Sequence, residues 1–82
     1  MFKLTESSTE KDEALFDKLR TTRKELADAQ NVPPYIVFSD ATLVEMSQQY
    51  PKNERELIRV SGIGQLKLER NGEAFLKVIT TH

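Results

Sequence analysis

Two consecutive prolines constrain the fold of this chain more than any other feature. They stand in NVPPYIVFSD, residues 31–40. Proline lacks a backbone N–H and disfavours helix at the residue before it, so the chain is expected to leave the helical region there. Ser39 or Asp40 can then cap a new helix that begins at Ala41. The stretch is predicted to be a short, stiff, extended connector between two helices, with Tyr35 held on it at little entropic cost.

The residues before the connector, 11–30, have the periodicity of an amphipathic helix. Its apolar side chains recur three or four positions apart and form one stripe. The stripe comprises Leu15, Phe16, Leu19, Leu26 and Ala27. The surface carries a cluster of cations at Lys18, Arg20, Arg23 and Lys24. Asp17–Arg20 and Lys24–Asp28 are spaced for ion pairs, so these cations form either a solvated face or one that also meets phosphates.

After the connector, residues 41–50 are predicted to form a second helix that Pro51 ends. Its inward-facing residues are expected to be Leu43, Val44, Met46 and Tyr50. Asn53 followed by Glu56 resembles a capping box, with asparagine in place of serine or threonine. This arrangement predicts a short third helix that ends at Val60.

The last part of the chain is predicted to hold two helices with a break between them. Asn71 and Gly72 both tolerate positive φ, so the fourth helix is expected to end at about Arg70. The fifth helix is expected from Glu73 to about Thr80. Its buried face would contain Phe75, Leu76, Val78 and Ile79.

Length and composition indicate one small domain. Residues 1–10 mix Ser, Thr and Glu without periodicity and are read as a flexible tail or linker, while residues 11–82 are predicted to be all-α, a compact bundle of about five short helices. The composition, 38% hydrophobic and 30% charged, is typical of a soluble globular protein. No apolar run approaches the roughly 20 residues of a membrane span, and the absence of cysteine fits a reducing compartment. A cytoplasmic location is therefore expected.

The residue types argue against an enzyme. The chain has no cysteine, and its one histidine is His82. Ser–His and Cys–His pairs and the common zinc arrangements are therefore missing. There is no G-x-x-x-x-G-K-[ST] loop for nucleotide phosphates. Neighbouring carboxylates such as Glu54 and Glu56 are typical of a solvated surface. The prediction is a non-catalytic domain without a metal or cofactor.

The turn Ser61-Gly62-Ile63-Gly64 has two interpretations. Two glycines around one apolar residue permit a tight turn whose N–H groups, beside a helix N-terminus, can hold a phosphate. In this respect it resembles the helix-hairpin-helix turn. Alternatively, the glycines only let two helices meet at a sharp angle, with Ile63 in the core. Gly62 and Gly64 are therefore candidates for a backbone phosphate turn.

Tyr35 also has two interpretations. Its ring can lie on the bundle with its hydroxyl bonded to a loop carbonyl, or it can form a platform for one nucleobase, worth about 1–3 kcal/mol. The cations upstream favour the second, because an aromatic ring with nearby cations is the arrangement that binds single strands. The predicted phosphate contacts are Arg20, Arg23 and Lys24, with Lys18 and Lys67 as outer candidates.

Three segments, taken together, carry a family resemblance. They are LFDKLRTTRKELA, NVPPYIVFSDATLVEM and ELIRVSGIGQLKLERNGEAFLKVI. Residues 12–81 resemble the HRDC domain, most closely the C-terminal HRDC domain of bacterial RecQ helicases. The resemblance implies a five-helix bundle that serves as an auxiliary nucleic-acid-binding module, tethered to an ATP-dependent DNA helicase core. It also implies that the aromatic after the double proline, here Tyr35, takes part in single-stranded DNA binding.

The leading hypothesis is a monomeric module that binds single-stranded DNA weakly and with little sequence preference, beside a helicase core in a bacterial cytoplasm. Contacts to three or four phosphates would give a slope of log affinity against log salt of about −2 to −3. The alternative is a protein-interaction module that docks on the helicase core or another partner. That module would use acidic residues and an apolar loop face made of Val32, Pro34, Tyr35 and Val37.

Overall fold

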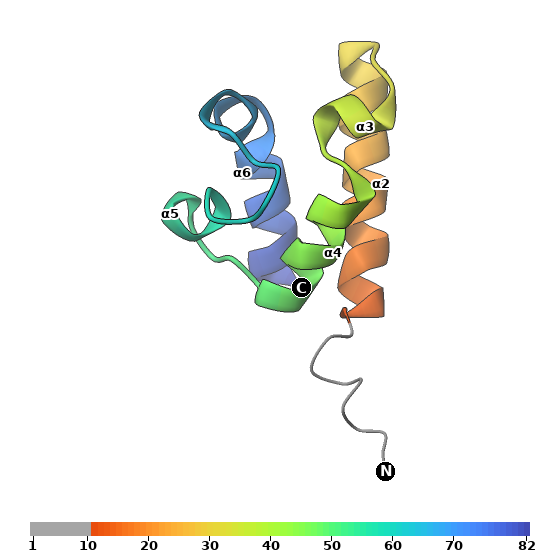
Figure 1. Cartoon of the computed structure of the whole chain (residues 1–82). Coiled ribbons are helices and arrows are strands. Elements are labelled where there is room, and N and C mark those ends of the chain that lie inside the picture. Colours follow the sequence, from red (N-terminus) through yellow and green to blue (C-terminus); the bar gives the residue numbers. More distant parts are fainter. Residues whose placement is uncertain (1–10) are drawn as a thin grey trace.

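Two long helices, α2 (Glu13–Gln30) and α6 (Gln65–Thr81), frame the molecule, and three shorter helices lie between them in the chain (Figure 1). The structure is a computed structural model that describes residues 11–82; the tail predicted for residues 1–10 lies outside this range. Within it, all regular elements are helices, five in number, and there is no strand. The predicted all-α class is therefore confirmed.

Helix α2 begins and ends with specific caps. The Asp12 carboxylate accepts the Leu15 N–H at 3.0 Å and satisfies one of the free donors of the first turn. Asn31 ends the helix in the left-handed region, with φ 62°, and its backbone N–H donates to the carbonyls of Ala27 and Asp28 in the last turn. The predicted stripe is buried at Leu15, Leu19 and Ala27, and this face supports the rest of the bundle.

The connector is not extended throughout, and the prediction of an extended backbone was wrong for its central residues, 34–37. Pro33 is extended, as expected, but Pro34–Val37 forms a single helical turn, α3. Pro34 occupies the first helical position, where a missing N–H costs no hydrogen bond and the fixed φ suits a helix. The turn is closed by a hydrogen bond in which the Ile36 N–H donates to the Pro33 carbonyl at 3.0 Å. The chain is extended again at Phe38.

Helices α4 (Asp40–Gln49) and α5 (Glu54–Leu57) follow. Ser39 caps α4, which begins one residue before the predicted start. Leu43 and Met46 are buried as expected, but Tyr50 is 39% exposed and adopts a left-handed C-cap, so its predicted inward orientation was wrong. The Asn53 cap of α5 is confirmed, although that helix ends before the predicted Val60.

The predicted break at Asn71 and Gly72 is absent, because α6 runs through both. Both residues are buried within the helix. A Cβ on Gly72 would lie 2.8 Å from Leu68 Cδ1 and 3.5 Å from Leu57 Cδ2, so the glycine lets α5 pack closely on α6. The Asn71 side-chain oxygen accepts the Gln30 amide at 2.8 Å. Tertiary contacts therefore override the local preference for a helix end.

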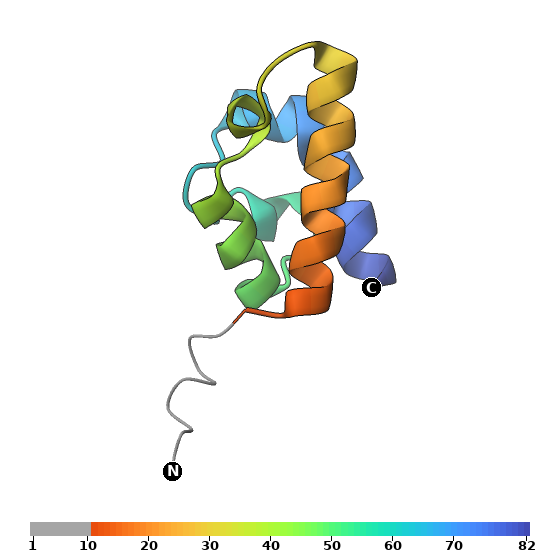
Figure 2. The ribbon, with the colours of Figure 1, turned by 90° about the vertical axis from the view of Figure 1, so that its right-hand side faces the viewer.

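The core lies where α2 meets α3, α4 and α6, while α5 packs against α6. Phe38 and Phe75 meet edge to face at its centre, with ring centroids 5.0 Å apart. The other residues with no exposed surface are Leu15, Leu19, Leu43, Met46 and Leu57. In two perpendicular views, α3 and the first turns of α6 lie at one end of the molecule, and the start of α2 lies at the other (Figures 1 and 2). No helix of the described residues has the length and hydropathy needed to cross a bilayer.

Candidate functional site

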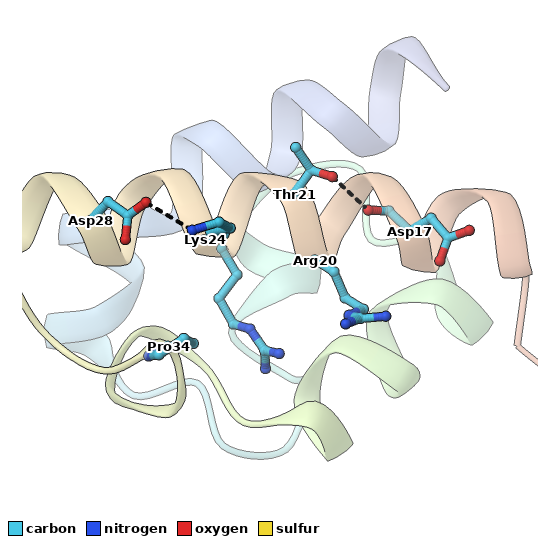
Figure 3. Close-up of a pocket in the computed structure, with 7 residues that line it drawn as sticks. Asp17, Arg20, Thr21, Lys24, Asp28 and Pro34 are labelled. Carbon is cyan, nitrogen blue, oxygen red and sulfur yellow. Dashed lines mark hydrogen bonds and ion pairs between the residues drawn. The ribbon is translucent and has the colours of Figure 1, made fainter.

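A shallow hollow between α2 and α3 brings together much of the predicted site. We call it the α2–α3 hollow. It is lined by Asp17, Arg20, Thr21, Arg23, Lys24, Asp28 and Pro34. Figure 3 shows Arg20 and Lys24 along α2, with Pro34 across from them on α3. Three predicted phosphate contacts therefore share one surface with the turn that carries Tyr35.

Tyr35 is the second residue of the α3 turn and is 66% exposed. The same turn buries Val37 completely, and Phe38 directly after it is in the core. These two side chains anchor the turn, so Tyr35 stands on a fixed support and faces solvent instead of covering the bundle. Its neighbour Ile36 is also exposed, at 44%. Tyr35 and Ile36 are therefore two adjacent exposed residues with apolar side chains.

Arg20 and Lys24 lie one helical turn apart on α2, about 6 Å along its axis. Lys24 pairs with Asp28 at 3.2 Å between exposed side chains, as its spacing predicted. Arg20 does not form the predicted pair with Asp17; its guanidinium carbon lies 5.9 Å from the centroid of the Phe16 ring. Both cations are exposed to solvent. Exposed ion pairs contribute little to stability, so a phosphate can compete for such groups.

Arg23 is placed differently from the other two cations. One guanidinium nitrogen donates to the Phe38 carbonyl at 3.0 Å, and another lies 2.8 Å from the Asp40 carboxylate. The Arg23 side chain is only 11% exposed. It therefore joins α2 to the segment between α3 and α4.

The net charge of the hollow is close to zero. Its lining holds three cations and two carboxylates, and a third carboxylate, Asp40, pairs with Arg23. The sequence interpretation treated Asp40 only as a possible helix cap. Its position at the end of the connector was a signal that it lies near the loop. The sequence does not reveal that its partner, Arg23, is 17 residues away. Any electrostatic attraction at this surface is therefore local and weak.

The outer candidates lie outside the lining of the hollow. Lys18 Nζ is 3.0 Å from the Nδ1 atom of His82, and Lys18 lines a separate groove with Val78 and Thr81. Lys67 is in the first turn of α6 and is partly buried. The structure therefore does not gather these two lysines with Arg20 and Lys24.

The glycine turn serves packing. Gly62 has φ 88°, and a Cβ there would collide with Thr42 Oγ1. The Thr42 hydroxyl donates to the Ser61 carbonyl at 2.8 Å, and Ile63 is buried. The Glu45 carboxylate accepts the Ser61 N–H at 3.3 Å. The negatively charged Glu45 side chain already accepts one N–H of the turn, and its charge would repel a phosphate. Only Gly64, the open N-cap of α6, leaves room for close approach.

The titratable groups with shifted pKa values lie outside the hollow. The pKa of Asp12 is lowered to about 2, chiefly because the Tyr50 hydroxyl and then the Leu15 N–H donate to its carboxylate. The same bond to Asp12 raises the pKa of Tyr50. This cluster joins the start of α2 to the end of α4, so its role is structural.

Comparison with known proteins supports the family resemblance. The model of the HRDC domain family matches residues 12–79. The chain is 49% identical over 71 residues to the ATP-dependent DNA helicase RecQ of Haemophilus influenzae and covers 12% of that protein. It is also 49% identical over 74 residues to the RecQ of Bacillus subtilis, again covering 12% of the relative. These matches span 87% and 90% of this chain.

A solved structure has the same fold. It is described as the D. radiodurans RecQ HRDC domain 3, and it superposes with a TM-score of 0.79 at 34% identity. The alignment covers 82% of this chain and 88% of the solved one. The family match, the identity to RecQ helicases and the shared fold agree, and the chain belongs to the HRDC domain family.

Proposed function

We propose that this domain is an auxiliary, non-catalytic module of a bacterial RecQ-type helicase that binds single-stranded DNA weakly and with little sequence preference. It would act in the cytoplasm, as a monomer without a cofactor of its own. The relatives from H. influenzae and B. subtilis are ATP-dependent DNA helicases, and the chain corresponds to a small part of each. The rest of such a protein would supply the ATP-driven chemistry.

The observation that carries this proposal is the exposed ring of Tyr35 on an anchored turn. Because Val37 and Phe38 are buried, the turn loses little conformational freedom when a base stacks on Tyr35. Stacking on an aromatic ring is sequence-tolerant, since every base has a π face, and it is worth about 1–3 kcal/mol per base. A surface turn also reaches unpaired bases without having to enter a groove.

Phosphate contacts would come from Arg20 and Lys24, which are exposed beside the turn. With Arg23 engaged elsewhere, two phosphate contacts are the expected number. The slope of log affinity against log salt should then be about −1.4, shallower than the three or four contacts estimated from sequence would give. Lys18 and Lys67 would add at most peripheral contacts. In the full protein, tethering to the helicase core raises the effective concentration of DNA at this weak site.

A titration with a short oligothymidylate, followed by amide chemical shifts at several salt concentrations, tests the proposal. We expect shifts centred on Tyr35 and on residues 20–24. Tyr35→Ala should weaken binding by about 5- to 140-fold, the loss of one stacked base. Tyr35→Phe keeps the ring and should bind nearly as well as the wild type. Equal affinity of the wild type and Tyr35→Ala would exclude stacking on this residue.

Docking of a protein is the second candidate function, and one observation favours it. Ile36 projects beside Tyr35, and the charge around both is nearly balanced. If the pair docks on a helicase core, Ile36→Ser should weaken that contact and leave DNA shifts unchanged. Absence of any shift with millimolar DNA at low salt would favour docking. Shifts centred on Gly62 and Gly64 would instead move the DNA site to the glycine turn.

A further inference from the structure

We infer that Arg23 is a positioning residue for Tyr35 and not a ligand of the DNA phosphates. This inference rests on the proposed function of Tyr35, because positioning matters only if that ring receives a base. It assigns different roles to three cations that are neighbours on α2: Arg20 and Lys24 would meet the strand, and Arg23 would hold the turn that presents the aromatic ring.

The contacts of Arg23 converge on the exit of the α3 turn. Its guanidinium donates to the Phe38 carbonyl at 3.0 Å and pairs with Asp40, the first residue of α4, at 2.8 Å. The Phe38 ring, in turn, is fixed against Phe75 in the core. Arg23 therefore fixes the backbone three residues after Tyr35 from the solvent side, while the Phe38 ring fixes it from the inside.

The entrance of the turn is held separately. The Val32 N–H donates to the Ala27 carbonyl at 3.0 Å, and the two prolines restrict the backbone that follows. The exit has no proline and is held by the Phe38 ring, by the two contacts of Arg23 and by Ser39, which caps α4. Loss of Arg23 should therefore loosen one end of α3 without unfolding α2.

The geometry of Arg23 argues against a contact with phosphate. Only 11% of the side chain is exposed, and two guanidinium nitrogens are already engaged by Asp40 and the Phe38 carbonyl, so little of the group is left for a phosphate. A lysine at this position would keep the charge, but its compact ammonium cannot reproduce a planar fork that serves two acceptors. The substitution Arg23→Lys therefore separates charge from positioning.

The experiment compares Arg23→Lys and Arg23→Gln in a Tyr50→Phe background. The chain has two tyrosines and no tryptophan, so this background leaves Tyr35 as the only source of tyrosine fluorescence. Oligothymidylate is titrated at several salt concentrations, and the affinity, the salt slope and the quenching of Tyr35 at saturation are measured. Far-ultraviolet circular dichroism checks that each variant is folded.

If Arg23 positions Tyr35, both variants should bind about tenfold more weakly, the typical effect of losing a hydrogen bond to a charged group. The salt slope should stay at the value of the background protein, and the quenching at saturation should fall. If Arg23 instead binds a phosphate, Arg23→Lys should behave like the background protein, and Arg23→Gln should make the slope shallower by about 0.7. That result, or unchanged binding in both variants, overturns the inference.

A measurement without DNA distinguishes failure of this inference from failure of the proposed function. The Ile36 and Phe38 N–H groups close the α3 turn by donating to the carbonyls of Pro33 and Pro34. In Arg23→Lys, hydrogen exchange at both amides should be about tenfold faster, with exchange in α2 unchanged. Asp40→Ala, which removes one of the two contacts, should give a smaller increase. Unchanged exchange in both variants would refute positioning, whether or not the wild type binds DNA.

Discussion

At the scale of single residues, the two glycines of the Ser61–Gly64 turn differ in what they contribute. Gly62 has positive φ and stands against the hydroxyl of Thr42. Gly64 has φ −91° and open space where a side chain would begin. The motif looks symmetrical in sequence, but only Gly62 is required by the backbone and by packing.

Alanine substitutions should separate these roles. Gly62→Ala should lower the free energy of unfolding by about 1–3 kcal/mol, because a Cβ is strained at positive φ and meets Thr42. Gly64→Ala, the matched control, should change it by less than about 0.5 kcal/mol, since the loss of a glycine cap and the gain in chain stiffness are of similar size. Urea denaturation of both variants measures the difference, and equal losses would contradict this assignment.

At the scale of elements, helix α6 shows how a tertiary contact overrides a local signal. Asn71-Gly72 reads as a helix end, but Gly72 has helical backbone and packs beneath Leu57 of α5. A glycine inside a helix costs about 1 kcal/mol relative to alanine. Here the missing side chain permits the close approach of two helices.

A series at position 72 tests this reading. Gly72→Ala should change the free energy of unfolding by less than about 1 kcal/mol, because the gain in helix propensity offsets the shift of the Leu68 side chain. Gly72→Val should destabilise by about 1–3 kcal/mol through overpacking against Leu57 and Leu68. Thermal or urea unfolding gives both values. If alanine were as harmful as valine, the packing would not tolerate even one added methyl group at this position, and the expected offset by helix propensity would be wrong.

The elements that sequence predicted well are those with local signals. The apolar stripe of α2, the start of α4 near Ser39 and the Asn53 cap of α5 all depend on residues within one or two turns. The connector was misread because the restriction on the residue before proline was extended to the residues after it. Pro34 itself is well suited to start a helix.

The part of the candidate site that sequence predicted also depends on residues that are close together in the chain. The exposed ring and the cations of α2 share a surface because the connector folds back along the helix, and their closeness in sequence indicated this. The engagement of Arg23 depends on Asp40, which only the folded chain brings within 2.8 Å. A count of cations in sequence therefore overestimates those that are free to meet a ligand.

At the scale of the whole molecule, one carboxylate joins three distant parts of the chain. The Asp12 carboxylate caps α2, accepts a hydrogen bond from the Tyr50 hydroxyl at 2.5 Å and lies 3.1 Å from Nε2 of His82. The backbone N–H of Asp12 donates to the Ser47 carbonyl. Both ribbon views place the start of α2, the end of α4 and the end of α6 together (Figures 1 and 2). This cluster closes the end of the bundle opposite Tyr35.

The charge of Asp12 should make the stability of the bundle pH-dependent in acid. Its pKa is lowered from 3.8 to about 2 in the folded state, so the unfolded chain takes up its proton first as the pH falls. The stabilisation is therefore complete above about pH 5 and is lost progressively as the pH falls toward 2. Asn caps helices as well as Asp does, so Asp12→Asn removes the charge and keeps the cap.

Urea denaturation of the wild type and Asp12→Asn between pH 2 and pH 7 checks this expectation. The wild type should be the more stable protein at neutral pH, and the difference should shrink between about pH 5 and pH 2. Tyr50→Phe removes the largest cause of the shift and should reduce the same acid dependence. A constant difference across the range would mean that Asp12 acts only as a cap. In that case hydrogen bonding, rather than charge, would join the three helix ends.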